Sequence, residues 1–324
     1  MGKTNSTSFK ELTTLKVGGN IKYFREVSSK KEIVEVVNFA KKNNLSIFII
    51  GGGSDIAVND KNFDGLVIKY VGNKSQITNH KSHVLISVEA GIVWDDLVKL
   101  AVERNLQGIE CLSGIPGSVG ASPIQNIGAY GQELSETLDR LTAYDITNQK
   151  FIDFSNKDCK FGYRESIFKQ KDYWQKFIII NITLKLKRYE DNDLSLQTIR
   201  DEILRVRGEK LVNPDDIPNA GSFFKNPIVY LSKKVELEEK YSDIKIYPFQ
   251  GKYKVFAGFL IEKAGWKGKS LGPVKVSEKH ALVLTNPGGK GTFSDIKNLA
   301  DAIIKDVQDK FGIILEPEVQ YINL

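Results

Sequence analysis

Apolar residues recur at helical spacing in several parts of the chain. After Ser29, Ile33, Val36, Val37 and Ala40 repeat at i, i+3, i+4 and i+7, which predicts an amphipathic helix with one buried face. Ser29 and Glu32 form a possible capping box at its start. The same spacing predicts helices over residues 94–101, 196–206 and 259–264, and a last helix that Ser294 caps and that ends before Phe311-Gly312.

Short apolar runs between these helices predict strands. They cover residues 47–50, 55–58, 65–69, 84–89 and 281–285. Residues 141–144 and 151–154 flank the turn Thr147-Asn148-Gln149 and predict a hairpin. In residues 180–187, apolar residues at even positions alternate with polar ones, which implies a single buried face.

One uncharged stretch, residues 112–131, stands out in a chain of which 27% is charged. Glycines at 114, 117, 120, 128 and 131, with Pro116 and Pro123, exclude a regular helix. Its donors and acceptors are main-chain groups and short polar side chains, which suit a large planar or phosphorylated ligand. The simpler alternative is a glycine-rich connection between packed elements.

A second glycine run, residues 51–54, follows a predicted strand. Another strand, not a helix, comes next, so the dinucleotide-binding pattern of a Rossmann fold is excluded. The run predicts either a loop whose amides hold a pyrophosphate or a tight hairpin. Residues 288–292 resemble a phosphate loop, but the Walker spacing is absent, and we expect a turn there.

Composition narrows the class of protein. The chain has 324 residues, of which 41% are hydrophobic, enough for two or three domains. Its net charge of +6 is spread among interleaved acids and bases, which argues against nucleic-acid binding. Cys111 and Cys159 are far apart, and His80 and His83 have no further ligands nearby, so no disulfide or metal site is expected. No stretch predicts a signal peptide or a membrane span, so we expect a soluble, intracellular protein.

Five separated motifs occur in one order along nearly the whole chain: GGGS at 51–54, SGIPGSVGASPIQNIGAYGQE at 113–133, YRES at 163–166, NAGSFFKNP at 219–227 and LEPEV at 315–319. In this combination the chain resembles the UDP-N-acetylenolpyruvoylglucosamine reductases of bacterial cell-wall synthesis. Five ordered motifs are far more specific than a single glycine loop.

The resemblance implies an α+β fold. Its FAD-binding domain would be of the vanillyl-alcohol-oxidase type, built from two α/β subdomains over residues 1–72 and 73–190. A substrate domain would follow over residues 191–318, and the tail 319–324 is a candidate to join the first subdomain.

The resemblance also implies an activity. The expected reaction is the NADPH-dependent reduction of UDP-N-acetylglucosamine enolpyruvate to UDP-N-acetylmuramate, by hydride transfer through non-covalent FAD. It further implies a cytoplasmic bacterial enzyme, expected to be a monomer, with a small-molecule substrate and no nucleic-acid or membrane partner.

Three residues match the catalytic positions of that family. Arg164 is always protonated and suits a developing negative charge on the substrate carboxylate. Glu318 is expected to orient the enol form, and Ser222 to donate the proton. Without the resemblance, the simpler interpretations are a structural arginine after a glycine turn, a solvated glutamate and a capping or turn serine.

Two larger sets follow from the same resemblance. The substrate is expected to contact Tyr163, Lys210, Asn226 and His280, and no metal is implied. FAD is expected to contact Gly51, Gly52, Gly53, Ser54, Asp55, Ser113, Gly114, Ile115, Pro116, Gly120, Ala121, Gln125, Asn126, Gly128, Ala129 and Tyr130.

The chain also departs from parts of the family. Residues 187–195 are short where some members carry a tyrosine-bearing loop, and Tyr189 is not equated with that tyrosine. His280 stands where some members have glutamine, and Gln320 where arginine is frequent. The competing interpretations are an FAD oxidase or dehydrogenase of the same fold, acting on an alcohol or hydroxy acid, and a flavin- or nucleotide-sugar-binding protein without catalysis.

Overall fold

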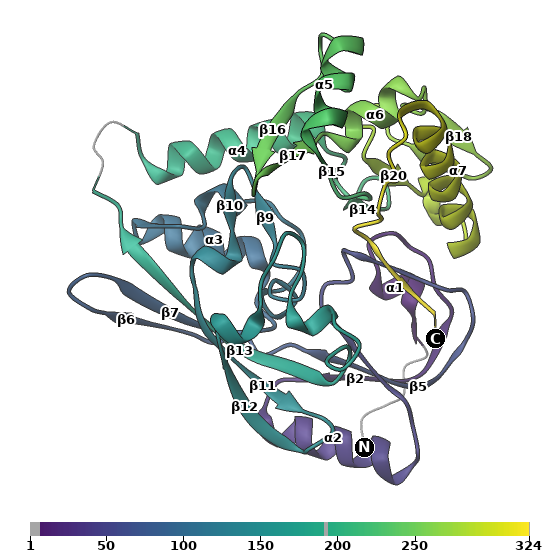
Figure 1. Cartoon of the computed structure of the whole chain (residues 1–324). Helices are drawn as coiled ribbons and strands as arrows, with labels where there is room; N and C mark the ends of the chain where they lie inside the picture. The colour runs from purple at the N-terminus through teal and green to yellow at the C-terminus, as the bar shows by residue number, and fades with distance from the viewer. Residues whose placement is uncertain (1–6, 191–193, 324) are drawn as a thin grey trace. The chain divides into compact units, whose positions relative to one another are not determined.

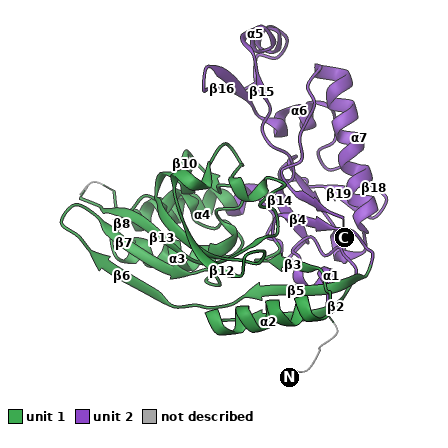
Figure 2. Cartoon of the chain, turned by 60° about the horizontal axis from the view of Figure 1, so that its bottom comes forward, with its two compact units in different colours: residues 1–7, 20–53, 62–207 green, residues 8–19, 54–61, 208–324 purple. Residues whose placement is uncertain are grey.

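The computed structural model describes residues 7–190 and 194–323. The chain folds into two compact units (Figures 1 and 2). Unit 1 contains residues 1–7, 20–53 and 62–207, and unit 2 contains residues 8–19, 54–61 and 208–324. Each unit is therefore assembled from separate pieces of sequence. None of the helices in the described ranges has the length and apolarity needed to cross a bilayer.

The first layer of unit 1 is a parallel sheet in the order β2 (Asn20–Val27), β5 (Phe63–Tyr70), β3 (Ile47–Ile50). The two-residue strand β1 (Thr7–Ser8) precedes β2 in the sheet order. Helix α2 (Lys30–Lys42) buries the predicted face of Ile33, Val36, Val37 and Ala40 in a core with Leu66 and Ile68 of β5. Helical spacing thus places α2 on this sheet, as Figure 1 shows.

The second layer of unit 1 is an antiparallel sheet in the order β12-β11-β13-β7-β6. Its strands are β12 (Lys150–Ser155), β11 (Leu138–Asp145), β13 (Phe177–Arg188), β7 (Val84–Glu89) and β6 (Ser75–Asn79), and β8 (Leu106–Gln107) pairs with the end of β13. The predicted hairpin is confirmed as β11 and β12, which pair from Asp145↔Lys150 to Arg140↔Ser155.

Two helices complete unit 1, α3 (Trp94–Glu103) and α4 (Leu196–Lys210), of which α4 lies in unit 1 up to Arg207. The chain between α3 and β11 contains the uncharged stretch, with the short hairpin β9 (Gly128–Ala129) and β10 (Gln132–Glu133). Short 3₁₀ helices occupy Glu110–Leu112, Val119–Ala121, Leu134–Glu136, Lys157–Cys159 and Ile167–Lys169.

Unit 2 has three small sheets. The first runs β14 (Asn219–Ser222), β20 (Val283–Thr285), β19 (Val274–Val276), β18 (Ser270–Leu271). The second runs β15 (Ile228–Val229), β17 (Lys252–Val255), β16 (Ile246–Phe249). In the third, β21 (Gln320–Ile322) pairs in parallel with β4 (Ile56–Val58), a strand of the expected first subdomain.

The helices of unit 2 are α1 (Phe9–Leu12), α5 (Leu231–Lys240), α6 (Ala257–Lys263) and α7 (Phe293–Phe311), with a 3₁₀ turn at Pro287–Gly289. The predicted apolar face of α7, from Ile296 to Val307, is fully buried in the core of this unit. Gly312 ends α7 at φ +64°, the left-handed conformation that glycine adopts at helix ends.

Several local predictions differ from the structure. Ser294 is not the cap of the last helix, because Thr292 accepts the hydrogen bond from Asp295 N and Asp295 reaches back to Thr292 N. Ser29 is the N-cap of α2 as predicted, because its Oγ accepts from Glu32 N, but the Glu32 carboxylate accepts from Ser28 N. The hairpin alternative at residues 51–54 is wrong, since β3 pairs with β5 and β4 with β21.

Two further differences concern the antiparallel sheet. Thr183 is buried at 3% exposure, although the alternation placed it on the outer face of β13. Its hydroxyl finds a partner in Ser87 on β7. Strand β6 was missed because its residues are almost all polar and exposed, as suits the edge of a sheet.

The three-part division at residues 72, 190 and 318 stays a prediction. In the structure, α4 up to Arg207 groups with unit 1, whereas the sequence predicted that this helix begins the substrate domain. The charged boundary at 187–193 lies partly outside the described residues.

The reciprocal cap of α7 predicts a stability effect. Thr292→Ala removes the acceptor for Asp295 N and is expected to lower the free energy of unfolding by about 1 kcal/mol. Ser294→Ala is the matched control, because Ser294 is a helical residue and its change is expected to stay within about 0.5 kcal/mol. Urea unfolding of both variants measures the difference; equal losses would contradict the assignment of the cap.

Candidate functional site

The uncharged stretch of unit 1 is an ordered loop whose own side chains hold it in shape. Ser113 Oγ donates to Glu110 O at 2.6 Å, and Ser122 Oγ donates to Val119 O at 2.6 Å. Asn126, 1% exposed, donates through Nδ2 to Glu133 Oε2 and Gly162 O and accepts from Ser135 N through Oδ1. These polar groups satisfy one another within unit 1, so they build the loop.

The two glycine runs of unit 1 approach each other at backbone distance. A Cβ on Gly52 would lie 2.7 Å from Gly117 Cα, and one on Gly51 would lie 2.8 Å from Ser118 Oγ. A Cβ on Gly120 would lie 2.6 Å from Ala90 Cβ. Such distances leave no room for a side chain, so these glycines are required by packing.

The meeting of these loops leaves hydrogen-bonding groups unused. Within residues 7–190 and 194–323, no acceptor is in place for the amides of Gly51, Gly52, Gly117 or Ser118. Gln125 Oε1 is buried and has no hydrogen-bond partner in the same ranges. A ligand that carries anionic oxygens and at least one N–H donor would satisfy both kinds of group. FAD, with its pyrophosphate and its flavin N–H, has this chemistry.

A strained turn in unit 1 presents Arg164. Gly162 and Glu165 exchange two main-chain hydrogen bonds, and Arg164 between them adopts φ +56°. Its Nη2 donates to Gly128 O at 2.6 Å, and its guanidinium lies 5.5 Å from the centroid of the Tyr163 ring. A non-glycine residue at this φ costs of order 1 kcal/mol, which is typical of a functional position.

In unit 2, main-chain pairing brings Ser222 and Glu318 to neighbouring segments. Ser222 ends β14, opposite Val283 of β20. The isolated bridge Phe224↔Pro317 then joins this segment to residues 316–318, with Lys225 N donating to Glu316 O at 2.9 Å and Glu318 N donating to Phe223 O at 2.8 Å. Glu318 is thus fixed by the carbonyl of the residue that follows Ser222.

Lys210 and Lys267, called the cationic cluster below together with His280, act electrostatically on this histidine in unit 2. Burial, with the positive charges of Lys210 and Lys267 nearby, holds the pKa of His280 below its usual range, although Glu262 opposes this. His280 Nδ1 accepts from Leu282 N at 3.2 Å, so the neutral ring carries its proton on Nε2. The cluster therefore combines two ammonium groups with one neutral N–H donor, a set that suits phosphate oxygens.

The chain is similar to known proteins over most of its length. Residues 21–150 match a model of an FAD binding domain, and residues 213–322 match the model of the C-terminal domain of UDP-N-acetylenolpyruvoylglucosamine reductase. The reductase of that name from Pseudomonas aeruginosa is 38% identical over 331 aligned positions, covering 96% of each chain. The one from Alcanivorax borkumensis is 40% identical over 290 positions, 84% of this chain and 83% of its own.

The chain belongs to the UDP-N-acetylenolpyruvoylglucosamine reductase family. A solved structure of the reductase from Thermus caldophilus, 23% identical, covers 99% of both chains with a TM-score of 0.72 and confirms the predicted fold class. The family and its FAD binding domain establish an FAD-dependent oxidoreductase. In the described ranges, no group of three or more His, Cys, Asp or Glu residues is arranged to hold a metal ion.

The structure distributes the predicted site residues of this reductase between its units. Unit 1 holds Arg164, Tyr163, Gly51 to Gly53 and every predicted FAD contact in residues 113–130. Unit 2 holds Ser54, Asp55, Lys210, Ser222, Asn226, His280 and Glu318. Asn226 Oδ1 accepts from Ala257 N, the first amide of α6. The individual roles of these residues stay predictions.

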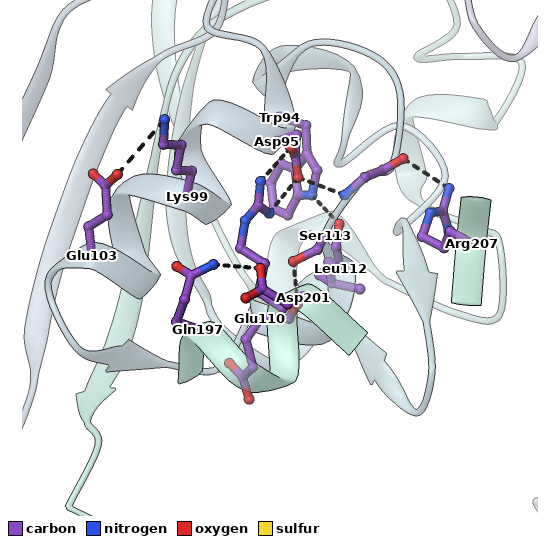
Figure 3. Close-up of polar contacts among 12 residues, drawn as sticks. Trp94, Asp95, Lys99, Glu103, Glu110, Leu112, Ser113, Gln197, Asp201 and Arg207 are labelled. Atoms are coloured by element: carbon purple, nitrogen blue, oxygen red, sulfur yellow. Dashed lines mark hydrogen bonds and ion pairs between the residues drawn. The ribbon is translucent and has the colours of Figure 1, made fainter. Parts of the chain in front are cut away.

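Sequence reasoning missed several charged residues that shape the loop. Asp95, at the start of α3, accepts a hydrogen bond from Gly114 N. Arg200 of α4 donates to Asp95, and Arg207 of α4 donates to Gly114 O (Figure 3). In the sequence, Asp95 is typical of acids in the first turn of a helix. Arg200 and Arg207 are typical of residues on the solvent-exposed face of a helix. Only the internal contacts of unit 1 distinguish them.

Tight packing of the glycine loops predicts that Gly52→Ala weakens FAD binding. The added Cβ must displace the Gly117 backbone, so the FAD dissociation constant is expected to rise about tenfold or more. Gly208→Ala is the control, because a Cβ there meets nothing within 4 Å and alanine favours the helix. Fluorescence titration of the apoproteins with FAD measures both; an unchanged affinity for Gly52→Ala would show that the loops have room to separate.

His280 predicts a pH dependence of stability. The pKa of His280 is lower in the folded chain than in the unfolded chain. Below about pH 6.5 the unfolded chain therefore binds a proton that the folded chain does not, and the free energy of unfolding decreases as the pH is lowered. His280→Gln is expected to flatten this slope, by at most about 1.4 kcal/mol per pH unit. Urea unfolding from pH 7.5 to 5.5 tests it, with His80→Gln, at an exposed position between β6 and β7, as the comparison. A slope unchanged by His280→Gln would contradict the shift.

Proposed function

We propose that this chain catalyses the NADPH-dependent reduction of UDP-N-acetylglucosamine enolpyruvate to UDP-N-acetylmuramate in peptidoglycan synthesis. Its family and its FAD binding domain support FAD-dependent reduction of that small UDP-sugar substrate. NADPH as the reductant, a monomeric enzyme, a cytoplasmic location and the roles of individual residues are added by the proposal. The main-chain pairing that fixes Glu318 beside the Ser222 segment is the structural observation that carries it.

The residues have separate tasks in this reaction. Bound FAD supplies the transfer of hydride from NADPH to the terminal carbon of the enolpyruvyl group. Arg164 stabilises the negative charge that develops on the substrate carboxylate. Ser222 donates its hydroxyl proton to the adjacent carbon, and Glu318 orients the enol form. Hydride and proton together saturate the double bond.

Local geometry supports the role of Arg164 as a fixed cation. Its Nη2 is held by Gly128 O, and Gly128 itself lies close enough that a Cβ would be 3.0 Å from Arg164 Nη1. The main chain of β9 therefore helps to position the guanidinium. A positioned cation costs no reorganisation when charge develops on the substrate.

Ser222 is held in a similar way. Asn219 Oδ1 accepts from Gly221 N, and Phe223 N donates to Leu282 O, so hydrogen bonds fix the backbone on both sides of the serine. Gly221 adopts φ +70°, which glycine accepts without strain. A serine hydroxyl is a weak acid, but a carbanion or enolate is a strong base, so a fixed hydroxyl suffices as the proton donor.

The cationic cluster of unit 2 is assigned to the substrate diphosphate. Lys210 and His280 were both expected to contact substrate, and the positive charge of Lys210 helps to hold the pKa of His280 below its usual range. Lys267, which was not predicted, adds a second ammonium group and is paired with Glu262 at 3.2 Å. In this proposal the neutral Nε2–H of His280 donates to a phosphate oxygen.

The first test follows the visible spectrum of the holoenzyme without oxygen. NADPH is expected to bleach the flavin bands, and the enolpyruvyl sugar is expected to restore them. Bands that return only with oxygen would favour an oxidase instead. A protein that takes up no FAD, even after reconstitution, would refute the proposal.

Ser222→Ala tests the proton donor in the same experiment. Bleaching by NADPH is expected to proceed at the normal rate, and reoxidation by the substrate to slow by about a hundredfold or more, because the proton is missing. Ser232→Ala, on an exposed position of α5, is the control and should leave both rates unchanged. Equal reoxidation rates in single-turnover mixing would remove Ser222 from the mechanism.

A further inference from the structure

Within unit 1, the first residues of the uncharged stretch (residues 112–131) are held from two sides, by α3 and by α4. Figure 3 shows the contacts. From α3, Trp94 Nε1 donates to Leu112 O at 3.1 Å, and Asp95 Oδ1 accepts from Gly114 N at 2.6 Å. From α4, Arg207 Nη2 donates to Gly114 O at 3.0 Å. Both polar main-chain groups of Gly114 are therefore occupied.

Asp95 is the centre of this arrangement. Besides Gly114 N, its carboxylate accepts from Arg200 Nη1 at 2.7 Å and Arg200 Nη2 at 2.6 Å. The Arg200 side chain is 7% exposed and that of Asp95 is 31% exposed, so this is a shielded, bidentate pair. Such charge-assisted bonds are shorter and stronger than neutral ones and fix direction as well as distance.

Gly114 is a residue that needs such restraint. It adopts φ +71°, and a glycine there has no side chain to limit its rotation. A Cβ would lie 2.9 Å from Leu204 Cδ2 and 3.1 Å from Arg207 Nε, so α4 packs directly against it and any larger residue would force these side chains to shift. Hydrogen bonds to its N–H and C=O are thus the available means of fixing this peptide.

We propose that Asp95 is a positioning residue for FAD binding: by holding Gly114 N while it anchors Arg200, it keeps the loop that begins at Gly114 in its binding conformation. The inference rests on the proposed assignment of that loop to FAD. A loop already ordered before the ligand arrives does not have to lose conformational freedom on binding. Release of Gly114 therefore weakens FAD binding.

An ion pair that merely stabilises the fold would behave differently. In that case FAD affinity would follow overall stability, whichever residue of the α3 region is changed. If Asp95 acts through Gly114, affinity depends on an acceptor for the Gly114 amide. The two roles can be separated by variants that affect the amide and the ion pair unequally.

Three variants make this separation, measured by FAD titration and FAD release rates. Asp95→Ala removes the acceptor, and its dissociation constant is expected to rise about tenfold or more, mostly through faster release. Asp95→Asn keeps an acceptor for Gly114 N but loses the bidentate ion pair with Arg200. Its FAD affinity is expected to lie between those of wild type and Asp95→Ala. Arg200→Met leaves the carboxylate on Gly114 and is expected to change affinity by less than about threefold.

Matched controls come from the same helices. Glu103→Gln breaks the exposed Lys99–Glu103 pair on α3, and Asp201→Ala removes the Gln197–Asp201 contact on α4; both are expected to bind FAD normally. Val98→Ala removes fully buried volume from α3 and should lower the unfolding temperature of the apoprotein without a matching loss of affinity.

Two results would overturn the proposal. One is an Asp95→Ala protein that binds FAD as wild type does. The other is a loss of affinity that simply follows unfolding temperature across Asp95→Ala, Arg200→Met and Val98→Ala. If Asp95→Ala fails to fold, the FAD affinities of Asp95→Asn and Arg200→Met are compared. Weaker FAD binding by Arg200→Met than by Asp95→Asn would contradict the role of Asp95. Failure of the proposed function shows separately, as wild-type protein that takes up no FAD.

Discussion

Contact of backbone with backbone is the constraint on which unit 1 depends. Gly52 lies against Gly117, and Gly120 against Ala90, at distances that exclude any side chain. This contact brings residues 51–53 to the loop that begins at Leu112, and it leaves the amides of Gly51, Gly52, Gly117 and Ser118 without acceptors among the described residues. A site made of main-chain donors recognises the charge and shape of its ligand. Side chains of the loop, such as those of Ser113, Ser122 and Asn126, can then form the hydrogen bonds that hold the loop in shape.

Unit 2 holds the two candidate catalytic side chains, Ser222 and Glu318, which come from distant parts of the sequence. The bridge between Phe224 and Pro317 does this with main-chain bonds, and Lys225 adds a 2.6 Å contact to Glu316. Because Phe223 and Phe224 are buried beside these bonds, the segment has little freedom to slide. The positions of Ser222 and Glu318 are thus set by the sheet and the core of that unit.

Periodicity was sufficient for the regular elements, since α2, α3 and α7 each show one apolar stripe that the structure buries. It failed where a polar residue has a specific partner. Thr183 is buried because Ser87 is opposite, and Thr292 caps α7 because Asp295 reciprocates one turn later. Pairings such as β4 with β21 follow from tertiary packing, which no local pattern encodes.

The candidate site likewise combines residues that sequence motifs identify with residues whose roles depend on tertiary contacts. Motifs identified the family, the glycine loops and the three catalytic candidates, because their residue types are constrained by chemistry. Asp95, Arg200, Arg207 and Lys267 carry no motif, and their importance comes from partners that are distant in sequence. Asn126 stays a predicted FAD contact, and the sequence did not show that its side chain bonds Glu133, Ser135 and Gly162.

The parallel pairing of β4 with β21 has a consequence for the order of events during synthesis. Strand β4 emerges from the ribosome early, but β21 follows every other described element of the chain. Until β21 arrives, the edge of β4 that it covers has no partner, and the segment that carries Glu318 cannot pair with Phe224. Unit 2 therefore completes its fold only after β21 has been synthesised, when the residues of unit 1 are already available to form their own fold.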